Sequence, residues 1–73
     1  MPMQPTIKLI INGNLRSFEA DIFTVKNLVS HLNLEGRRLA IECNGEIVPR
    51  SHFSDTILAE GDQLEIVGAV GGG

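Results

Sequence analysis

Three consecutive glycines, Gly71, Gly72 and Gly73, close the sequence behind an apolar run. Glycine carries no side chain, so an enzyme can close a narrow tunnel around this segment and leave the terminal carbonyl open to attack. The α-carboxylate of Gly73 has a reference pKa of about 3.3–3.7, so it is ionised at neutral pH and needs activation, for instance by adenylation. A disordered tail, a cloning scar and a domain cut from a longer chain are the competing interpretations, and composition alone slightly favours them.

Cys43, His31 and His52 carry the side-chain chemistry that a nucleophile, a general base or a metal site would use. Cys43 alternates with Leu39 and Ile41, so we expect its thiol in the core, where cysteine acts as a small inert hydrophobe. Neither histidine has a second ligand at a recognised spacing, so we expect both to be solvated. The glycine run is not a phosphate-binding loop, because such a loop opens a helix. The sequence thus predicts no intrinsic catalytic residue, no metal and no bound cofactor.

Length and charge narrow the classes of protein that the sequence can encode. A chain of 73 residues makes one small domain, whose core supplies ~3–5 kcal/mol, and this favours a carrier or binding module over a stand-alone enzyme. The formal net charge of -3 argues against nucleic acid and anionic membranes as partners. The single cysteine forms no internal disulfide, and we find neither a signal peptide nor a long apolar run. We therefore expect a cytoplasmic protein that is monomeric when free.

Two Asn-Gly turns organise the strands of the predicted sheet. Residues 6–20 and 38–49 each predict a β-hairpin around such a turn, because both turn residues tolerate a positive φ. In the second strand of the first hairpin, Leu15 and Phe18 break the period of two. This break predicts a β-bulge or leaves the register of that strand open.

One helix and one further strand complete the predicted elements. Apolar residues recur at helical spacing within residues 24–36, with Thr24 as the N-cap and Gly36 as the stop. A helix of this length is marginal alone, so we expect it to lie on the sheet. Residues 63–70 predict the last strand, because apolar and polar side chains alternate there.

The segment between the second hairpin and the last strand is irregular. Its apolar residues Phe53, Ile57 and Leu58 are expected to close the core from outside the sheet. The resulting ββαββ–β order predicts an α+β roll, in which one helix lies across one face of a mixed sheet. We place the domain at residues 1–67 and a flexible glycine-rich tail at residues 68–73.

Apolar residues near the tail suggest a docking surface for a protein partner. A short edge strand cannot bury both faces, so either Ile47 or Val48 is expected to face outward. Val67 lies on the exposed face of the last strand, and Ala69 and Val70 lead into the glycines. Exposed apolar side chains beside a reactive terminus are what a docking patch requires. Simple packing explains the same residues about equally well.

The element order, the run NGEIVPRSHFSDTILAEGDQLEIV and the terminal glycines together resemble the ThiS family of sulfur carrier proteins. The resemblance covers nearly the whole chain and implies the β-grasp fold of ubiquitin. It also implies that the Gly73 carboxylate becomes an adenylate and then a thiocarboxylate, while Gly71 and Gly72 form the slender neck that threads partner active sites.

The same resemblance implies partners that perform all of the catalysis. An E1-like adenylyltransferase would activate the carboxylate with ATP and magnesium. A cysteine desulfurase, or the activating enzyme itself, would deliver a persulfide sulfur. Thiazole synthase would then take that sulfur into the thiazole phosphate ring of thiamine. Nothing in the family pattern gives chemistry to Cys43, in agreement with the expected core position.

Three other classes of function remain open at this point: related carriers, protein modifiers and structural modules. The small subunit of molybdopterin synthase has the same fold and terminus but usually a longer chain, and carriers for cysteine synthesis or tRNA thiolation are related possibilities. A protein-conjugating modifier would join Gly73 to lysines on its targets. A structural β-grasp module with an inert tail would tolerate the loss of Gly72 and Gly73.

Overall fold

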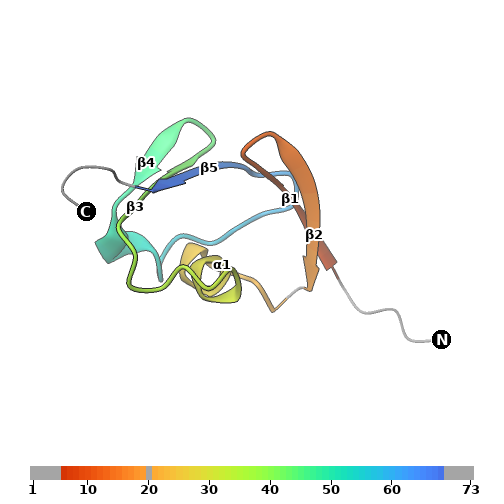
Figure 1. The fold of residues 1–73 in the computed structure, drawn as a ribbon. Coiled ribbons are helices and arrows are strands. Elements are labelled where there is room, and N and C mark those ends of the chain that lie inside the picture. Colours follow the sequence, from red (N-terminus) through yellow and green to blue (C-terminus); the bar gives the residue numbers. More distant parts are fainter. Residues whose placement is uncertain (1–5, 20, 69–73) are drawn as a thin grey trace.

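The computed structural model describes residues 6–19 and 21–68 (Figure 1). Within these residues the chain forms five strands, one α-helix and one turn of 3-10 helix. The elements in chain order are β1 (Thr6–Ile11), β2 (Asn14–Glu19), α1 (Val25–His31), β3 (Leu39–Cys43), β4 (Glu46–Val48), η1 (Arg50–His52) and β5 (Gln63–Gly68).

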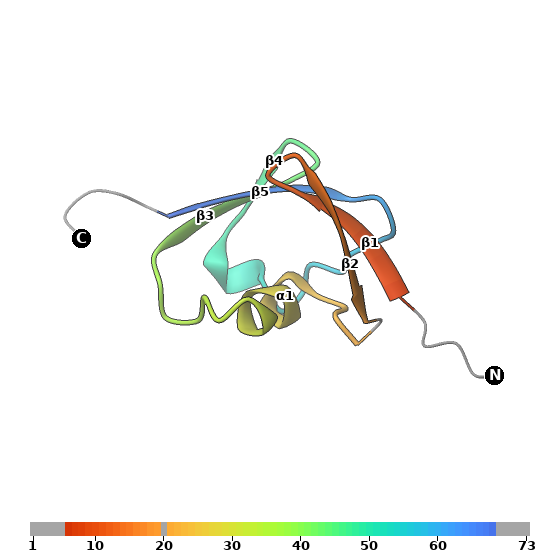
Figure 2. The same ribbon diagram turned by 45° about the vertical axis from the view of Figure 1, so that its right-hand side comes forward.

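The strands form one mixed sheet in the order β2-β1-β5-β3-β4, with the last strand of the chain at its centre. β5 runs parallel to β1 and antiparallel to β3, and the two hairpins supply the outer pairs. The sheet curves around α1, which covers one of its faces (Figure 2). This arrangement confirms the predicted α+β roll with one helix across a mixed sheet.

Both hairpins turn at Asn-Gly, as predicted. Asn12 and Asn44 have φ of 52° and 53°, and the glycines that follow them have φ of 85° and 88°. These positive angles are those of type I′ turns, whose twist matches that of the flanking strands. The bulge predicted in β2 is wrong, because β1 and β2 pair without interruption. Leu15 breaks the period simply because its side chain points to the outer face, while Phe18 is buried on the inner face.

The N-terminus of α1 follows the prediction. The Thr24 hydroxyl accepts a hydrogen bond from the backbone N–H of Asn27, and the Asn27 side chain accepts one from the Thr24 N–H. This reciprocal capping box satisfies backbone donors that the first helical turn leaves unpaired.

The predicted stop of the helix at Gly36 is wrong, because α1 ends at His31. Asn33 takes a left-handed conformation with φ of 60°. Its N–H donates to the Ser30 carbonyl at 3.1 Å, and the N–H of Leu34 donates to the Val29 carbonyl at 2.9 Å. These two bonds form a Schellman motif. Asn33 takes the left-handed conformation that ends the helix, which the prediction assigned to Gly36.

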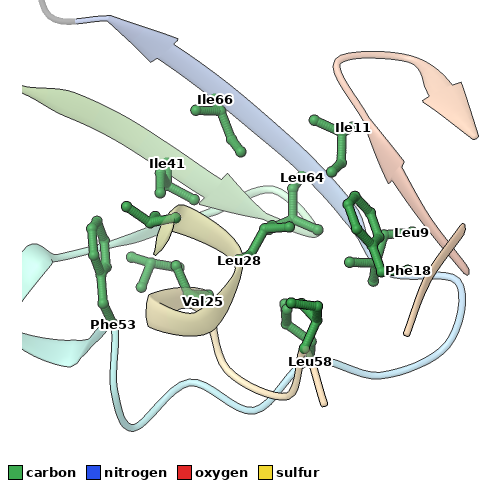
Figure 3. Close-up of a cluster of buried hydrophobic side chains, with 13 residues drawn as sticks. Leu9, Ile11, Phe18, Val25, Leu28, Ile41, Phe53, Leu58, Leu64 and Ile66 are labelled. Carbon is green, nitrogen blue, oxygen red and sulfur yellow. The ribbon is translucent and has the colours of Figure 1, made fainter. Parts of the chain in front are cut away.

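The core lies between α1 and the inner face of the sheet (Figure 3). Leu64 of the central strand is fully buried and lies above Leu28 of the helix (Figure 3). All five strands, the helix, and the connections that precede α1 and β5 contribute side chains to one cluster. Its buried members are Leu9, Ile11, Phe18, Ile22, Val25, Leu28, Val29, Ile41, Val48, Phe53, Leu58, Leu64 and Ile66.

The connection before β5 closes the core with two of its three predicted residues. Phe53 and Leu58 are buried, whereas Ile57 is 60% exposed, so its predicted core position is wrong. Ile57 pairs with Thr24 in an isolated bridge, and the N–H of Leu58 donates to the Phe23 carbonyl at 2.9 Å. Neighbouring residues of an extended segment point to opposite sides, so burial of Leu58 turns Ile57 outward.

The two turn asparagines also bind the central strand that passes between the hairpins (Figure 1). The Asn12 side chain accepts a hydrogen bond from the Ile66 N–H at 2.8 Å and donates one to the Ile66 carbonyl at 3.1 Å. The Asn44 side chain accepts one from the Gln63 N–H at 3.0 Å. Asn12 therefore replaces a neighbouring strand where β1 has already turned away, and it holds β5 close to its C-terminal end.

Replacement of Asn12 by glycine is expected to lower the free energy of unfolding by about 1–3 kcal/mol. Glycine accepts the positive φ, but the two hydrogen bonds to Ile66 are lost, and each contributes about 0.5–1.5 kcal/mol. Asn33→Gly is the matched control, because Asn33 has the same backbone region and no side-chain hydrogen bond to the described residues. Urea denaturation of both variants tests this. Equal stabilities would show that the Asn12 side chain does not hold β5.

Candidate functional site

The predicted reactive tail begins at the end of the central strand. Gly68, which the prediction placed in the tail, is the last residue of β5 and lies opposite Leu39 of β3. The remaining predicted residues lie outside the described part of the chain: Ala69, Val70, Gly71, Gly72 and Gly73. The tail, meaning residues 69–73 from here on, therefore follows the central strand, which pairs with β3 as far as Gly68 and with β1 as far as Leu64.

The attachment of the tail is fixed by backbone pairing on one side and by a side chain on the other. β3 pairs with β5 along its whole length, up to Leu39 opposite Gly68. On the side of β1, strand pairing reaches only Leu64, and the Asn12 side chain takes over at Ile66. The end of β5 at Gly68 is called the root of the tail from here on. A carrier needs a fixed root, because a rigid domain can then present the tail in one direction. Sequence reasoning missed the second role of this asparagine.

The outer face of the sheet carries apolar side chains close to this root. Val67 is 55% exposed and lies opposite Ala40 of β3, which is also exposed. On the edge strand Ile47 is 71% exposed, so the prediction that one of the two residues faces outward is confirmed for Ile47. Val48 is 9% exposed and faces the core, because adjacent strand residues point to opposite faces. Val48 therefore leaves the candidate docking surface.

A second apolar pair, which sequence reasoning did not single out, lies on the outer face of β1 and β2. Ile10 lies opposite Leu15, and Leu15 is exposed. The strict alternation of the β1 run places Ile10 on the face opposite Leu9 and Ile11, and this pattern was visible in the sequence.

Cys43 lies on the inner face of β3 and packs against the edge of the core, as its alternation predicts. Its thiol is half-buried and lies 3.9 Å from a carboxylate oxygen of Asp62. Burial raises the pKa of the Cys43 thiol, and the negative charge of Asp62 raises it further. The thiol therefore stays protonated at neutral pH, and a protonated thiol is a poor nucleophile.

The resemblance found in the sequence implies sulfur loading at Gly73, and replacement of Cys43 by serine is expected to leave that loading within about twofold of wild type. The hydroxyl keeps a donor beside Asp62, and partial burial limits the loss in the free energy of unfolding to about 0.5–1.5 kcal/mol. Loading by the activating partner is measured by mass spectrometry, and folding is checked by circular dichroism. Loss of loading in a folded variant would give the thiol a catalytic role.

Both histidines are exposed, as predicted. The His31 ring contacts the edge of the Phe18 ring, with centroids 5.5 Å apart and planes at 86°. His52 ends the short helix η1. Among residues 6–19 and 21–68 no group of three histidine, cysteine or carboxylate side chains is placed to hold a metal ion. Within the same residues no helix is long and apolar enough to cross a membrane.

A five-stranded mixed sheet that wraps one helix and has its last strand at the centre defines a ubiquitin-like β-grasp domain. The described geometry adds exposed apolar side chains on the outer face of the sheet and a central strand that ends at Gly68. The model of the ThiS family matches residues 9–73. The chain therefore belongs to the ThiS family.

Solved and curated relatives agree with this assignment. The crystal structure of the thiamine biosynthesis protein ThiS from Geobacter metallireducens matches with a TM-score of 0.78 and 29% identity, over 92% of this chain and 100% of that one. The sulfur carrier protein ThiS of Bacillus subtilis is 32% identical over 65 residues, which are 89% of this chain and 98% of that protein.

The chain also matches part of longer proteins that are named thiazole synthase. The thiazole synthase of Paramagnetospirillum magneticum is 45% identical over 67 residues, which are 92% of this chain but 20% of that protein. The chain thus spans about one fifth of the length of the thiazole synthases that it matches.

Proposed function

We propose that this protein is a sulfur carrier that supplies sulfur for thiazole formation in thiamine biosynthesis. The observation that carries the proposal is the match to the ThiS family over residues 9–73, which includes the terminal glycines. The name of the Bacillus subtilis relative, a sulfur carrier protein that this chain covers almost completely, supports it.

The chemistry takes place at the Gly73 carboxylate, and partner enzymes perform it. An E1-like adenylyltransferase uses ATP and magnesium to form the acyl-adenylate, with pyrophosphate as the second product. A persulfide from a cysteine desulfurase, or from the activating enzyme, attacks the acyl carbon through its terminal sulfur and expels AMP. A thiol then reduces the resulting acyl disulfide, which leaves the thiocarboxylate on Gly73. Gly71 and Gly72 let the tail pass through a tunnel too narrow for side chains.

The body of the domain orients this tail, and its outer face is the proposed docking surface. Ile47 and Val67 expose apolar area on the same face of the sheet, where β3 places Ala40 opposite Val67 and Glu42 opposite Ile47. Ala69 and Val70 continue from this face in the sequence. An exposed apolar patch next to a reactive terminus suits a partner that must recognise the body and hold the tail together.

Replacement of Val67 by aspartate is expected to lower kcat/KM for adenylation by about tenfold or more, because a charge is then placed in an apolar interface. Gln63→Asp is the matched control, since Gln63 lies on the same strand and face but at the end far from the tail. Pyrophosphate release by the activating enzyme measures the rate. Equal rates for the two folded variants would remove this face from the docking surface.

Thiazole synthase is the proposed acceptor of the sulfur. Proteins named thiazole synthase contain a region similar to this whole domain, which is expected if carrier and synthase work on the same reaction. The test combines this protein, the activating enzyme, ATP, a sulfur donor and thiazole synthase with its other substrates. We expect thiazole phosphate to form only when this protein is present. Product formation at the same rate without it would refute the proposed function.

A further inference from the structure

A groove of about 450 Å³ lies directly beside the root of the tail. It runs between the first hairpin, the connection after α1 and the end of β5. It is called the root groove from here on, and its lining includes Arg16, Arg37, Arg38, Leu32, Leu34 and Gly68. Any enzyme that holds the tail must therefore come close to this groove, because the tail follows Gly68 directly in the sequence.

The positive charges of the protein are concentrated around the root groove. The adjoining groove on the other side of the same connection is lined by Lys26, Arg50 and Glu35. Five of the six cationic residues of the chain thus line the two grooves, with one carboxylate among them, which gives a formal charge of +4. The whole chain has a net charge of -3, so the rest of the surface is acidic.

Local contacts orient two of the guanidinium groups that line the two grooves, those of Arg16 and Arg50. The Arg16 guanidinium lies over the Phe18 ring at 5.2 Å from its centroid. The Arg37 backbone is held from two sides, because its N–H donates to Leu34 at 3.2 Å and its carbonyl accepts a hydrogen bond from the Arg50 guanidinium. Ordered guanidinium groups lose less side-chain entropy when they pair with carboxylates.

The floor of the root groove favours a peptide over a nucleic acid. Leu32 and Leu34 are partly buried there and supply apolar contact area. No aromatic side chain is among the described lining residues, so bases have no surface on which to stack. A segment with both carboxylates and apolar side chains complements the floor and the charged rim.

We propose that the root groove binds an acidic, partly apolar segment of the adenylating enzyme that acts on the tail. The inference rests on the proposed function, since it assigns a second contact to the same partner. The outer face of the sheet provides apolar docking, and the root groove adds an electrostatic contact on the opposite side of β5. Together the two surfaces hold the last strand from both faces and fix the direction in which the tail enters the enzyme.

The test compares Arg38→Glu with Lys8→Glu, which makes the same change in charge at the one cation outside the two grooves. The dissociation constant for the E1-like adenylyltransferase of the same organism is measured by calorimetry at low and high salt. We expect Arg38→Glu to raise the Kd about tenfold at low salt and Lys8→Glu to change it less than twofold. The difference should shrink near 1 M salt, where screening reduces the Debye length to about 3 Å.

Four results would overturn the inference. An equal Kd for the two variants, with wild type still loaded by the enzyme, would reject the groove contact and leave the proposed function intact. A lower Kd for Arg38→Glu would indicate that the groove instead holds the protein's own terminal carboxylate. Binding of a single-stranded oligonucleotide that Arg38→Glu abolishes would indicate a nucleic acid occupant. Failure of the enzyme to bind or load wild type would refute the proposed function itself, and the inference with it.

Discussion

Deletion of Gly72 and Gly73 is expected to lower sulfur loading at least about 100-fold while the domain stays folded. The deletion retracts the terminal carboxylate by about 7 Å, at ~3.3–3.6 Å for each residue. A misplacement of only about 1 Å from the attacking geometry can cost 100-fold in rate. Glycine has no side chain to bury in a core, so the free energy of unfolding should change by less than about 0.5 kcal/mol.

Deletion of residues 2–5 is the matched control, because it removes four residues from the other end of the chain, outside the matched family region. Loading is measured by the pyrophosphate released and by the mass of the product, and stability by urea denaturation. If the shortened tail is loaded as fast as wild type, the carboxylate position does not matter and the carrier mechanism fails. If both deletions reduce loading equally, the effect does not belong to the glycines.

Replacement of Leu64 by alanine is expected to cost about 2–5 kcal/mol of the free energy of unfolding. Leu64 is 0% exposed, lies at the centre of the sheet and packs against the helix (Figure 3). A domain of this size has only ~3–5 kcal/mol of stability, so the variant should be largely unfolded at 37 °C. Loading should fall in proportion to the folded fraction, because the partners recognise the folded body.

Val67→Ala is the matched control for Leu64→Ala, because Val67 lies three positions further along the same strand but faces solvent. Its cost should stay near 0.5 kcal/mol. Thermal denaturation followed by circular dichroism measures both variants. A Leu64→Ala protein that melts within a few degrees of wild type would show that the central strand contributes little to the core.

Local chemistry allowed most of the fold to be predicted. The two Asn-Gly turns determined the hairpins, because few other residue pairs accept a positive φ at both positions. The alternation of Leu64 and Ile66 correctly predicted their inward direction. The helix end was wrong because asparagine and glycine both accept the left-handed conformation, and the tertiary packing of Leu34 selected the earlier one.

The error at Ile57 and the choice left open for Val48 have a common cause. Both residues stand next to another apolar residue, Leu58 in one case and Ile47 in the other. Hydrophobicity alone does not reveal which of two neighbours faces inward, because the direction depends on a pairing partner far along the chain. The bridge from Ile57 to Thr24 and the pairing of Ile47 with Glu42 decide it in the structure.

The candidate site was only partly predictable from sequence. The glycine tail was predicted to be the functional site because of the family resemblance, since glycines alone are equally typical of a linker. The second role of Asn12 was hidden, because a turn asparagine gives no sign of binding a strand 54 positions away. The root groove was hidden as well, because its arginines come from β2 and from the connection after α1, which only the fold brings together.

The mass of the intact protein tests the central claim most directly. The protein is incubated with the activating enzyme, ATP, magnesium and a persulfide donor, and the last residue is then identified by fragmentation. We predict that the mass rises by the difference between one sulfur and one oxygen atom, and that the gain is located on Gly73. An unchanged mass beside an enzyme of proven activity, or a gain located on Cys43, would contradict the carrier mechanism.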